Sequence, residues 1–256
     1  MHTEGRTMLI GERQRRIIDE LKNFPDISVK ELAQKLYVSE PTIRRDLTAL
    51  HNRGIITKMY GGAVLNPANS FCEIPFSMRI SERSDTKQDI ARRAAERIED
   101  GMTIMLDGST SAYHMVPHLA QYKNLVVITS GARTAVLLAE ANIRTFCTGG
   151  QMIIHSYSYV GEQAEDFIRN FNADILFFSC HGLDREGRMT DNAIEEANLR
   201  KVMLRQADKK ILLCDSGKIG KRCIYNMGSI SEVDEVISDA LLPADISAMI
   251  GRGQRR

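Results

Sequence analysis

Residues 28–54 read SVKELAQKLYVSEPTIRRDLTALHNRG and predict two short helices joined by a tight turn. Ser28 and Glu31 have the spacing of a capping box, in which the two side chains satisfy the first free amides of a helix. The turn falls at Tyr37 and the residue after it, and Ser39 is of the residue type that begins a helix as its N-cap. A glycine closes the stretch, which is how many helices end.

The second helix has an apolar face and a basic face. At about 100° per residue, Ile43, Leu47 and Leu50 fall together on the side that must face a core. Arg45 then points almost directly away from that core, with Arg44 on its flank. Arginine bonds guanine edges, while hydroxyls and helix N-terminal amides hold phosphates. This face predicts DNA contacts from Ser39, Pro41, Thr42, Arg44, Arg45 and Thr48.

A basic pair on a surface helix is more often simply solvated, so the sequence context decides between the two interpretations. A third helix is expected before the pair, over residues 12–23. After the pair, residues 55–60 alternate like a hairpin strand and lead to a Gly-Gly pair. This is the order of elements in a winged helix-turn-helix. In the wing, Lys58 and Tyr60 are the predicted DNA-contacting residues.

From Thr86 onward, short apolar runs alternate with amphipathic segments, which is typical of βαβ units and a mostly parallel sheet with helices on both faces. The expected strands are residues 102–106, 125–129, 144–148, 175–179, 211–214 and 233–237. The expected helices are residues 89–99, 110–122, 133–141, 161–170 and 194–206. We therefore predict an α/β chain with a winged helix-turn-helix over 1–62, a linker over 63–85 and an open, mostly parallel α/β domain over 86–256.

Five of the expected strands are each followed by small, hydroxyl-bearing or charged residues. The carboxyl ends of parallel strands share one edge of the sheet, and ligands bind at that edge. One such loop is more often plain turn chemistry, but five on one edge favour a ligand site. Glycines there let the backbone approach a ligand, and hydroxyls and free amides bind anions. The residues that these loops contribute are Asp107, Gly108, Ser109, Thr110, Ser111, Ser130, Gly149, Gly150, Asp184 and Lys218.

Within this edge, Lys218 would add a positive charge, and Asp107 and Asp184 would accept hydrogen bonds from sugar hydroxyls. We interpret His181 as a buried histidine whose hydrogen bonds are satisfied. An enzyme remains an alternative, with Asp107, Asp184, Asp215 or Glu195 as its acid and base, although a carboxylate after a strand is more often a cap or a structural acceptor.

Composition narrows the class of protein. The net charge is +1, so it argues neither for nor against nucleic acid. No apolar run approaches the roughly 20 residues of a membrane span, and the N-terminus lacks a signal-peptide core. The five cysteines show no spacing of metal ligands. We expect a cytoplasmic protein with reduced thiols, no metal, no cofactor and no membrane partner.

The run VSEPTIRRDL at residues 38–47, followed by the Gly-Gly of the wing, strongly resembles the helix-turn-helix signature of the DeoR family of bacterial regulators. The runs LDGSTSA, VVITSG, TGG, SYVG, FFSCHGLD, GRMTD and LLCDSGKIGK resemble the sensor domain of that family. The resemblance spans essentially the whole chain. It implies that residues 39–53 are the recognition helix and residues 58–60 the wing.

The resemblance also implies a sensor domain similar in fold to ribose-5-phosphate isomerase, and hence a phosphorylated sugar or polyol as effector. By position, Ser109, Thr110 and Ser111 would hold the phosphate, and the residues around the ligand would be Gly149, Gly150, Gly161 and Lys218.

The leading hypothesis is a repressor of sugar or polyol metabolism genes that binds a double-stranded operator as a homodimer or homotetramer. Its operator affinity would change when the phosphorylated sugar binds. A sugar-phosphate isomerase-like enzyme with an accessory DNA-binding domain is the alternative, but the sequence lacks the acidic loop and the glycine-rich lysine segment of those isomerases. We therefore predict that the chain is not an enzyme. A third interpretation is a winged helix that makes only protein contacts.

Overall fold

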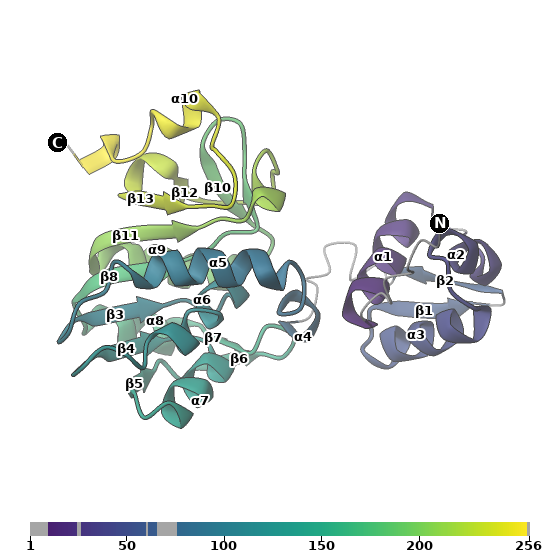
Figure 1. Cartoon of the computed structure of the whole chain (residues 1–256), viewed down its shortest axis with the longest axis horizontal. Helices are drawn as coiled ribbons and strands as arrows, with labels where there is room; N and C mark the ends of the chain where they lie inside the picture. Colours follow the sequence, from purple (N-terminus) through teal and green to yellow (C-terminus); the bar gives the residue numbers. More distant parts are fainter. Residues whose placement is uncertain (1–9, 25–26, 60, 66–75, 255–256) are drawn as a thin grey trace, which may run out of the picture. The chain divides into compact units, whose positions relative to one another are not determined.

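The computed structural model describes residues 10–24, 27–59, 61–65 and 76–254. The chain forms two compact units, Met1–Glu82 and Arg83–Arg256. Figure 1 labels their elements along the chain. Within the described residues, no helix is both long and apolar enough to cross a bilayer.

The first unit is a winged helix. Its elements are the helices α1 (Ile10–Asn23), α2 (Val29–Lys35) and α3 (Glu40–Asn52), the antiparallel strands β1 (Ile56–Met59) and β2 (Gly62–Leu65), and the short helix α4 (Phe76–Arg79). The apolar stripe expected on α3 is confirmed, because Ile43, Leu47 and Leu50 are all buried. They pack against apolar side chains of α1, α2 and both strands of the wing. The helix α3 is thus held by one face only.

The two helix starts of this unit differ. At Ser28 the capping box is complete: the hydroxyl accepts from the amide of Glu31, and the Glu31 carboxylate accepts from the amide of Ser28 at 2.9 Å. Ser39 is the N-cap of α3 by its backbone, but its hydroxyl accepts no helix amide and lies 2.9 Å from the Thr42 hydroxyl. The capping role expected for the Ser39 side chain is therefore corrected.

A buried ion pair fixes α3 against α1. Asp46 is only 2% exposed, and its carboxylate accepts from the Arg13 guanidinium, with Nη2 at 3.2 Å, and from the Gln14 amide at 3.3 Å. A buried carboxylate is costly unless it is paired in this way. Because Asp46 follows Arg45 directly, the pair also fixes which side of α3 the arginine faces.

The linker expected over 63–85 is shorter in the structure. The wing needs a second strand, so β2 extends into the expected linker and buries Ala63 in the core. At the other end, Met78 of α4 joins the same core. The helix α5 already begins at Ser84. Residues 66–75, which include Cys72, lie outside the described residues.

The second unit is built on a six-stranded sheet. All neighbouring strands are parallel, in the order β13-β11-β8-β3-β4-β5. The strands are β3 (Thr103–Leu106), β4 (Val126–Thr129), β5 (Arg144–Cys147), β8 (Ala173–Phe178), β11 (Ala207–Leu213) and β13 (Glu235–Ile237). Each overlaps one of the six expected strands, and the predicted α/β class is confirmed.

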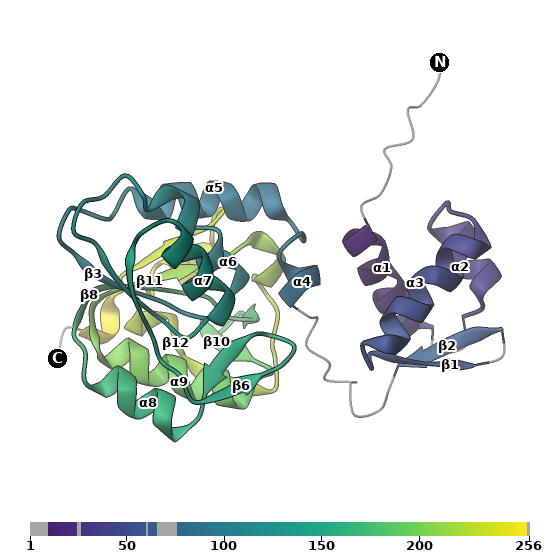
Figure 2. The same cartoon turned by 90° about the horizontal axis from the view of Figure 1, so that it is seen from below.

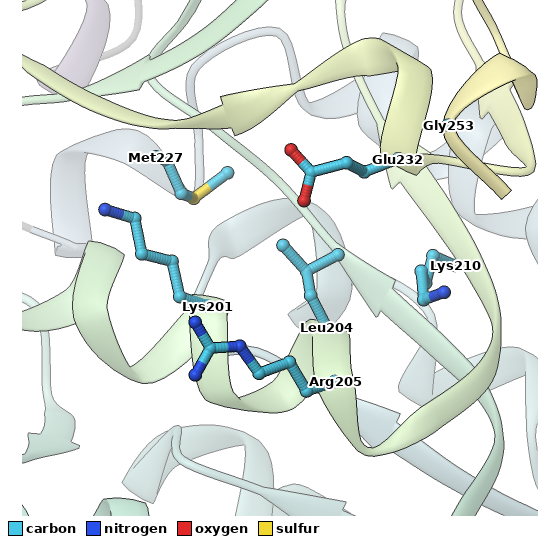
Figure 3. Close-up of a pocket in the computed structure, with 7 residues that line it drawn as sticks. All are labelled: Lys201, Leu204, Arg205, Lys210, Met227, Glu232 and Gly253. Atoms are coloured by element: carbon cyan, nitrogen blue, oxygen red, sulfur yellow. The ribbon is translucent and has the colours of Figure 1, made fainter. Parts of the chain in front are cut away.

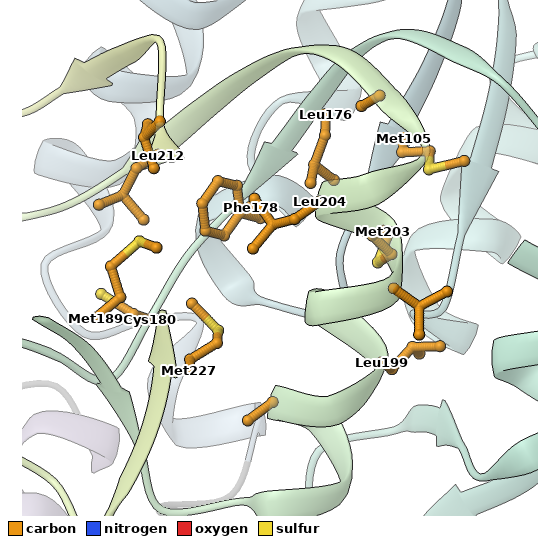
Figure 4. Close-up of a cluster of buried hydrophobic side chains, with 14 of the residues drawn as sticks. Met105, Leu176, Phe178, Cys180, Met189, Leu199, Met203, Leu204, Leu212 and Met227 are labelled. Carbon is orange, nitrogen blue, oxygen red and sulfur yellow. The ribbon is translucent and has the colours of Figure 1, made fainter. Parts of the chain in front are cut away.

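Helices cover both faces of this sheet, as Figure 2 shows. One face carries α5 (Ser84–Ala95), α6 (Thr110–Tyr113) and α7 (Ala132–Glu140), and the other α8 (Glu162–Arg169) and α9 (Ile194–Arg205). Successive residues of a strand enter opposite cores: Phe177 packs on the α5 side and Phe178 on the α9 side. Figure 4 shows side chains of β8 and β11 facing α9. This double burial explains the continuous apolar runs of the sequence.

Two β elements were not expected from the sequence. The strands β6 (Gln151–Ile153) and β7 (Ser158–Val160) form a hairpin, and β9 (Gly182–Leu183), β10 (Arg188–Asp191) and β12 (Tyr225–Ser229) form a small antiparallel sheet. The helix expected over 110–122 ends early, because Pro117 cannot continue an α-helix and begins a 3₁₀ turn instead. The remaining short elements are η2 (Val116–His118), η3 (Ser216–Lys218), η4 (Ile230–Glu232), α10 (Ala244–Ser247) and η5 (Arg252–Gln254).

The two caps give a stability test. Ser28→Ala removes a hydroxyl that accepts a helix amide, so we expect the first unit to lose about 1 kcal/mol of unfolding free energy in urea titrations. Ser39→Ala is the matched control, because that hydroxyl accepts no helix amide, and it should cost clearly less. Equal losses in the two variants would contradict the assignment of the caps.

Candidate functional site

The exposed face of α3 carries the residues predicted to contact DNA. Ser39, Pro41, Arg44, Arg45 and Thr48 are exposed, and Thr42 is half-buried. Arg44 lies 3.4 Å from the Glu40 carboxylate, in an exposed pair. For Arg45 the structure gives no ion pair or hydrogen bond among the described residues. Its guanidinium is therefore available to a partner outside the chain.

The wing is tied to this face. Lys58 on β1 is exposed and donates to the Thr48 hydroxyl at 3.1 Å, and Thr48 donates to the Arg44 carbonyl at 2.8 Å. One hydroxyl thus joins the wing to the middle of α3. Tyr60, the other predicted wing contact, lies outside the described residues. The face presents cations and hydroxyls side by side, which is the chemistry that binds phosphates and base edges.

In the second unit, the carboxyl ends of the strands meet at one edge of the sheet. Because β8 lies between β3 and β11, the loops that follow these three strands are neighbours. Ser179, directly after β8, joins them: its amide donates to Asp107 at 3.1 Å, and its hydroxyl donates to the Leu213 carbonyl at 2.5 Å. Lys218 lies with its ammonium 2.7 Å from the same hydroxyl. Hydrogen bonds of Ser179 therefore connect the three loops at the predicted edge.

The two aspartates expected to bind sugar hydroxyls also hold the fold together. Asp107 is 1% exposed and accepts from the amides of Ser109 and Ser179 and from the Arg200 guanidinium at 2.7 Å. Asp184 is also buried, and it accepts from two turn amides and from the Arg188 guanidinium at 2.7 Å. Both carboxylates are therefore held in place from within the chain, and their expected contact with sugar hydroxyls stays a prediction.

A buried arginine, Arg200, organises this region and was not found from the sequence. It is 4% exposed, and it contacts three carboxylates: Asp107 at 2.7 Å, Asp191 at 2.6 Å and Glu196 at 3.1 Å. Asp191 in turn pairs with Nδ1 of His181 at 2.8 Å. The spacing of Glu196 and Arg200 on α9 is that of an ordinary surface pair, so no sequence signal indicated their burial.

The network determines the charge of Asp191. Burial alone would raise the pKa of this carboxyl, but Arg200 and then His181 outweigh burial and hold the pKa well below its usual range. His181 is half-buried rather than buried, and the hydrogen bond expected for it is present at one ring nitrogen.

The loop after β3 carries hydroxyls of two kinds. Ser109 is used as the N-cap of α6 and accepts from the Ala112 amide at 3.1 Å. The hydroxyls of Thr110 and Ser111 have no protein partner among the described residues, although both residues are buried. Neither oxygen is among the buried atoms without a partner, so both are open to a partner from outside the chain.

Two further hydroxyls near this loop are buried without a partner. They belong to Ser158 on β7 and Thr134 on α7. A methyl group added at Gly108 would come within 1.9 Å of the Ser158 hydroxyl, and one added at Gly131 within 2.8 Å of the Thr134 hydroxyl. Only glycine allows this approach. Ser158 belongs to the SYVG run, but nothing in the sequence brought it to this loop.

The β6–β7 hairpin lies against the loop after β4. The Tyr159 amide donates to the carbonyl of Ser130 at 2.8 Å. Three of the predicted ligand glycines, Gly149, Gly150 and Gly161, flank this hairpin and have positive φ. At Gly150 a side chain would also meet the Val160 carbonyl at 2.7 Å. The structure thus gives these glycines a backbone role at the hairpin ends.

The carboxylate of Asp215 has three cations around it: Lys218, Arg83 and Lys87. Asp215 lies 3.4 Å from Lys218 and 3.2 Å from Arg83. Burial alone would raise the pKa of Asp215, but Lys218, Lys87 and Arg83 together lower it below its usual value. Arg83 and Lys87 were not among the predicted residues, because both lie before the sheet in sequence.

Comparison with known proteins identifies the family of the chain. The sequence matches the family model of the DeoR C terminal sensor domain over residues 82–240 and that of the DeoR-like helix-turn-helix domain over residues 13–68. The chain belongs to the DeoR family. It is accordingly a DNA-binding transcription regulator.

Similar proteins are named as regulators, not enzymes. The glycerol-3-phosphate regulon repressor of Escherichia coli is 30% identical over 93% of this chain and 94% of its own. The transcriptional regulator GlpR of Haloferax volcanii is 32% identical over 93% of each chain. Ribose 5-phosphate isomerase A of Methanocaldococcus jannaschii aligns with 53% of this chain and 54% of its own, at 15% identity and a TM-score of 0.41.

A separate pocket of this DeoR-family protein, of about 550 Å³, is shown in Figure 3. It lies between α9, β11 and β12 and contains none of the predicted effector residues. Its lining residues are Lys201, Leu204, Arg205, Lys210, Met227, Glu232 and Gly253. Among the described residues, no group of three or more His, Cys, Asp or Glu side chains could hold a metal ion.

The Arg200 network predicts a pH-dependent stability. Arg200→Met leaves three buried carboxylates without their cation, so we expect a loss of about 3–5 kcal/mol at pH 7 in urea unfolding. In the wild type, the low pKa of Asp191 gives stability that is complete above the unfolded pKa near 4 and is lost as the pH falls further. In the variant, burial favours the protonated acids, so its stability rises on acidification.

The difference in unfolding free energy between the wild type and Arg200→Met should therefore be smaller at pH 4.5 than at pH 7. Arg92→Met, which removes an exposed arginine of α5 that pairs only with carboxylates of its own helix, is the control and should change stability little at either pH. A loss that is equal at both pH values would show that the carboxylates do not depend on Arg200 for their charge.

Proposed function

We propose that this regulator represses genes of sugar or polyol metabolism and that a phosphorylated sugar bound at the carboxyl edge of its sheet changes its operator affinity. The observation that carries the DNA-binding part is the unpaired Arg45 on the exposed face of α3, opposite the buried Ile43, Leu47 and Leu50. That geometry supports α3 as the recognition helix in a major groove, with the wing beside it.

Within this proposal, the residues of the face divide by chemistry. Arg45 reads base edges, because a guanidinium can bond both acceptors of guanine. Ser39, Thr42 and Thr48 offer hydroxyls to the backbone, as do the amides at the start of α3, and Lys58 adds a charge from the wing. Pro41 and Arg44 line the groove beside Arg45, and Tyr60, which lies outside the described residues, is a further DNA contact.

Operator binding of this kind calls for two copies of the chain. A homodimer, or a homotetramer made of two dimers, would present two recognition helices to half-sites that are one helical turn or a multiple of it apart. Effector binding would shift the population that fits both half-sites. We place this activity with the chromosome, in the cytoplasm.

For the effector we propose the loop of Gly108, Ser109, Thr110 and Ser111 as the phosphate site. Support comes from the unpaired hydroxyls of Thr110 and Ser111 and from those of Ser158 and Thr134 beside them. Ser130 and Lys218 border the loops on either side, and Gly149, Gly150 and Gly161 place the hairpin next to them. The printed name of the Escherichia coli relative, a glycerol-3-phosphate regulon repressor, supports a small phosphorylated polyol or sugar.

Arg45→Ala tests the DNA-binding face. Against a duplex selected by the wild-type chain from a random pool, we expect a loss of about 1–3 kcal/mol, or roughly 5- to 150-fold in Kd, in a gel-shift titration at fixed salt. Discrimination at one base position should also relax. Arg16→Ala, an exposed arginine of α1 paired with Glu12, serves as control and should bind as the wild type does. An Arg45→Ala variant with unchanged affinity would remove this residue from base recognition.

Thermal unfolding tests the effector site. A panel of sugar phosphates that includes glycerol 3-phosphate and ribose 5-phosphate should contain a compound that raises Tm, because a ligand at 100 times its Kd stabilises the folded state by about 2.7 kcal/mol. The unphosphorylated sugars should not. The double variant Thr110→Val, Ser111→Ala keeps the shape of the loop but removes both hydroxyls, and we expect it to bind the active compound at least about tenfold more weakly.

The control for this experiment is Arg205→Ala in the separate pocket, which should respond to the compound as the wild type does. If Arg205→Ala loses the response and the loop variant keeps it, the effector binds in that pocket and not at the carboxyl edge.

A further inference from the structure

A small group of residues in the described chain adopts a backbone that disfavours any side chain. Positive φ places the Cβ of an L-residue against its own carbonyl, so glycine is the residue of choice there. Besides glycines, the residues with positive φ are Tyr37, Arg83, Asn124, Asn142 and Tyr157. A residue held in such a conformation needs a compensating gain, and that gain is often functional.

Four of these residues have a reason within the chain. Asparagine tolerates this conformation better than most residues, which accounts for Asn124 and Asn142. The Arg83 side chain donates to Asp215 and, at 2.7 Å, to the Ser216 hydroxyl. The ring of Tyr157 lies under the Arg133 guanidinium, 4.4 Å from it.

Tyr37 has no such reason. Its φ is 54°, and its side chain is 95% exposed, so the ring gains nothing from burial. Within the described part of the chain, its hydroxyl makes no hydrogen bond and its ring stacks on no other group. A tyrosine at this position therefore lowers the stability of the fold and exposes an aromatic ring. No contact within the described chain compensates for either.

The position of Tyr37 indicates which partner outside the chain compensates for this cost. Tyr37 lies in the turn between α2 and α3, which is fixed by hydrogen bonds from the Val38 amide to the Ala33 carbonyl at 3.0 Å and from its own amide to the Gln34 carbonyl. It comes two residues before Ser39, the start of α3. In a helix-turn-helix the N-terminal residues of the recognition helix contact base edges and the preceding helix crosses the DNA backbone. The turn that joins these two helices is therefore close to the sugar-phosphate backbone at the edge of the groove.

We propose that Tyr37 is a DNA-backbone contact, with its hydroxyl donating to a phosphate oxygen and its ring covering the adjoining deoxyribose. Tyrosine is among the side chains that bind phosphates in this way. The proposal rests on the DNA-binding function proposed above and adds a residue that carries no base information. It makes Tyr37 a residue that trades folding stability for affinity.

The test compares two properties of the full-length chain. Tyr37→Gly relieves the strained backbone, so we expect Tm of the first transition to rise by about 2–4 °C. The same variant should bind DNA about 10-fold more weakly. The loss should be similar for the selected duplex and for an unrelated duplex of equal length, because a backbone contact is independent of sequence. Tyr37→Phe keeps the ring and should lose about 3- to 5-fold.

Asn124→Gly is the matched control. Asn124 is also exposed and has a φ of 55°, but it lies in the second unit. The Asn124→Gly variant should be at least as stable as the wild type and should bind both duplexes with unchanged affinity. This control separates the effect of relieving a strained backbone from the effect of losing the tyrosine.

Two outcomes would overturn the proposal. One is Tyr37→Gly with wild-type affinity for both duplexes. The other is a loss of affinity that accompanies dissociation of the oligomer in sedimentation at the same concentration, which would place Tyr37 in contact with a second copy of the chain. A failure of the DNA-binding function itself would appear differently, as a wild-type chain that selects no duplex or an Arg45→Ala variant that binds normally.

Discussion

The carboxyl edge of the sheet depends on one buried guanidinium. Arg200 joins carboxylates from three elements, the loop after β3, the strand β10 and its own helix α9. Removing the cation from such a group leaves buried carboxylates without enough compensating charge, which is strongly destabilising. Through Asp107 the same group holds the amides of Ser109 and Ser179, so the loops of β3 and β8 depend on it. The proposed effector loop is thus held in place by a buried ion-pair network.

The first unit uses the same arrangement on a smaller scale. Asp46 faces inward and pairs with Arg13, while its neighbour Arg45 faces outward and has no partner in the described chain. In both units a buried ion pair sets the orientation of a functional segment. Arg45 and the buried hydroxyls of Ser158 and Thr134 have no partner in the described chain. A buried polar group without a partner costs folding stability, so the two hydroxyls mark where a ligand is expected to bind.

Tight packing around glycines completes the proposed effector site. Gly108 lies so close to Ser158 that no side chain fits between them, and this contact joins the loop of β3 to the β6–β7 hairpin. A ligand that meets the unpaired hydroxyls here would therefore contact two segments that are about 50 residues apart in sequence. Such a site can respond to a ligand as a unit, because packed interiors do not deform gradually.

Local sequence signals predicted the strands of the parallel sheet and the two faces of the recognition helix. Helix periodicity placed Ile43 inside and Arg45 outside, and alternating apolar runs located all six strands of the parallel sheet, because these signals are local and repeat along the chain. A carboxylate after a strand looks the same in sequence whether it faces a ligand or an arginine of the fold, so the contacts of Asp107 with Arg200 and of Asp184 with Arg188 could not be predicted. Only the tertiary structure brought Arg200, Ser158 and Thr134 to the edge, because their partners are distant in sequence and burial decides what their polar groups must do.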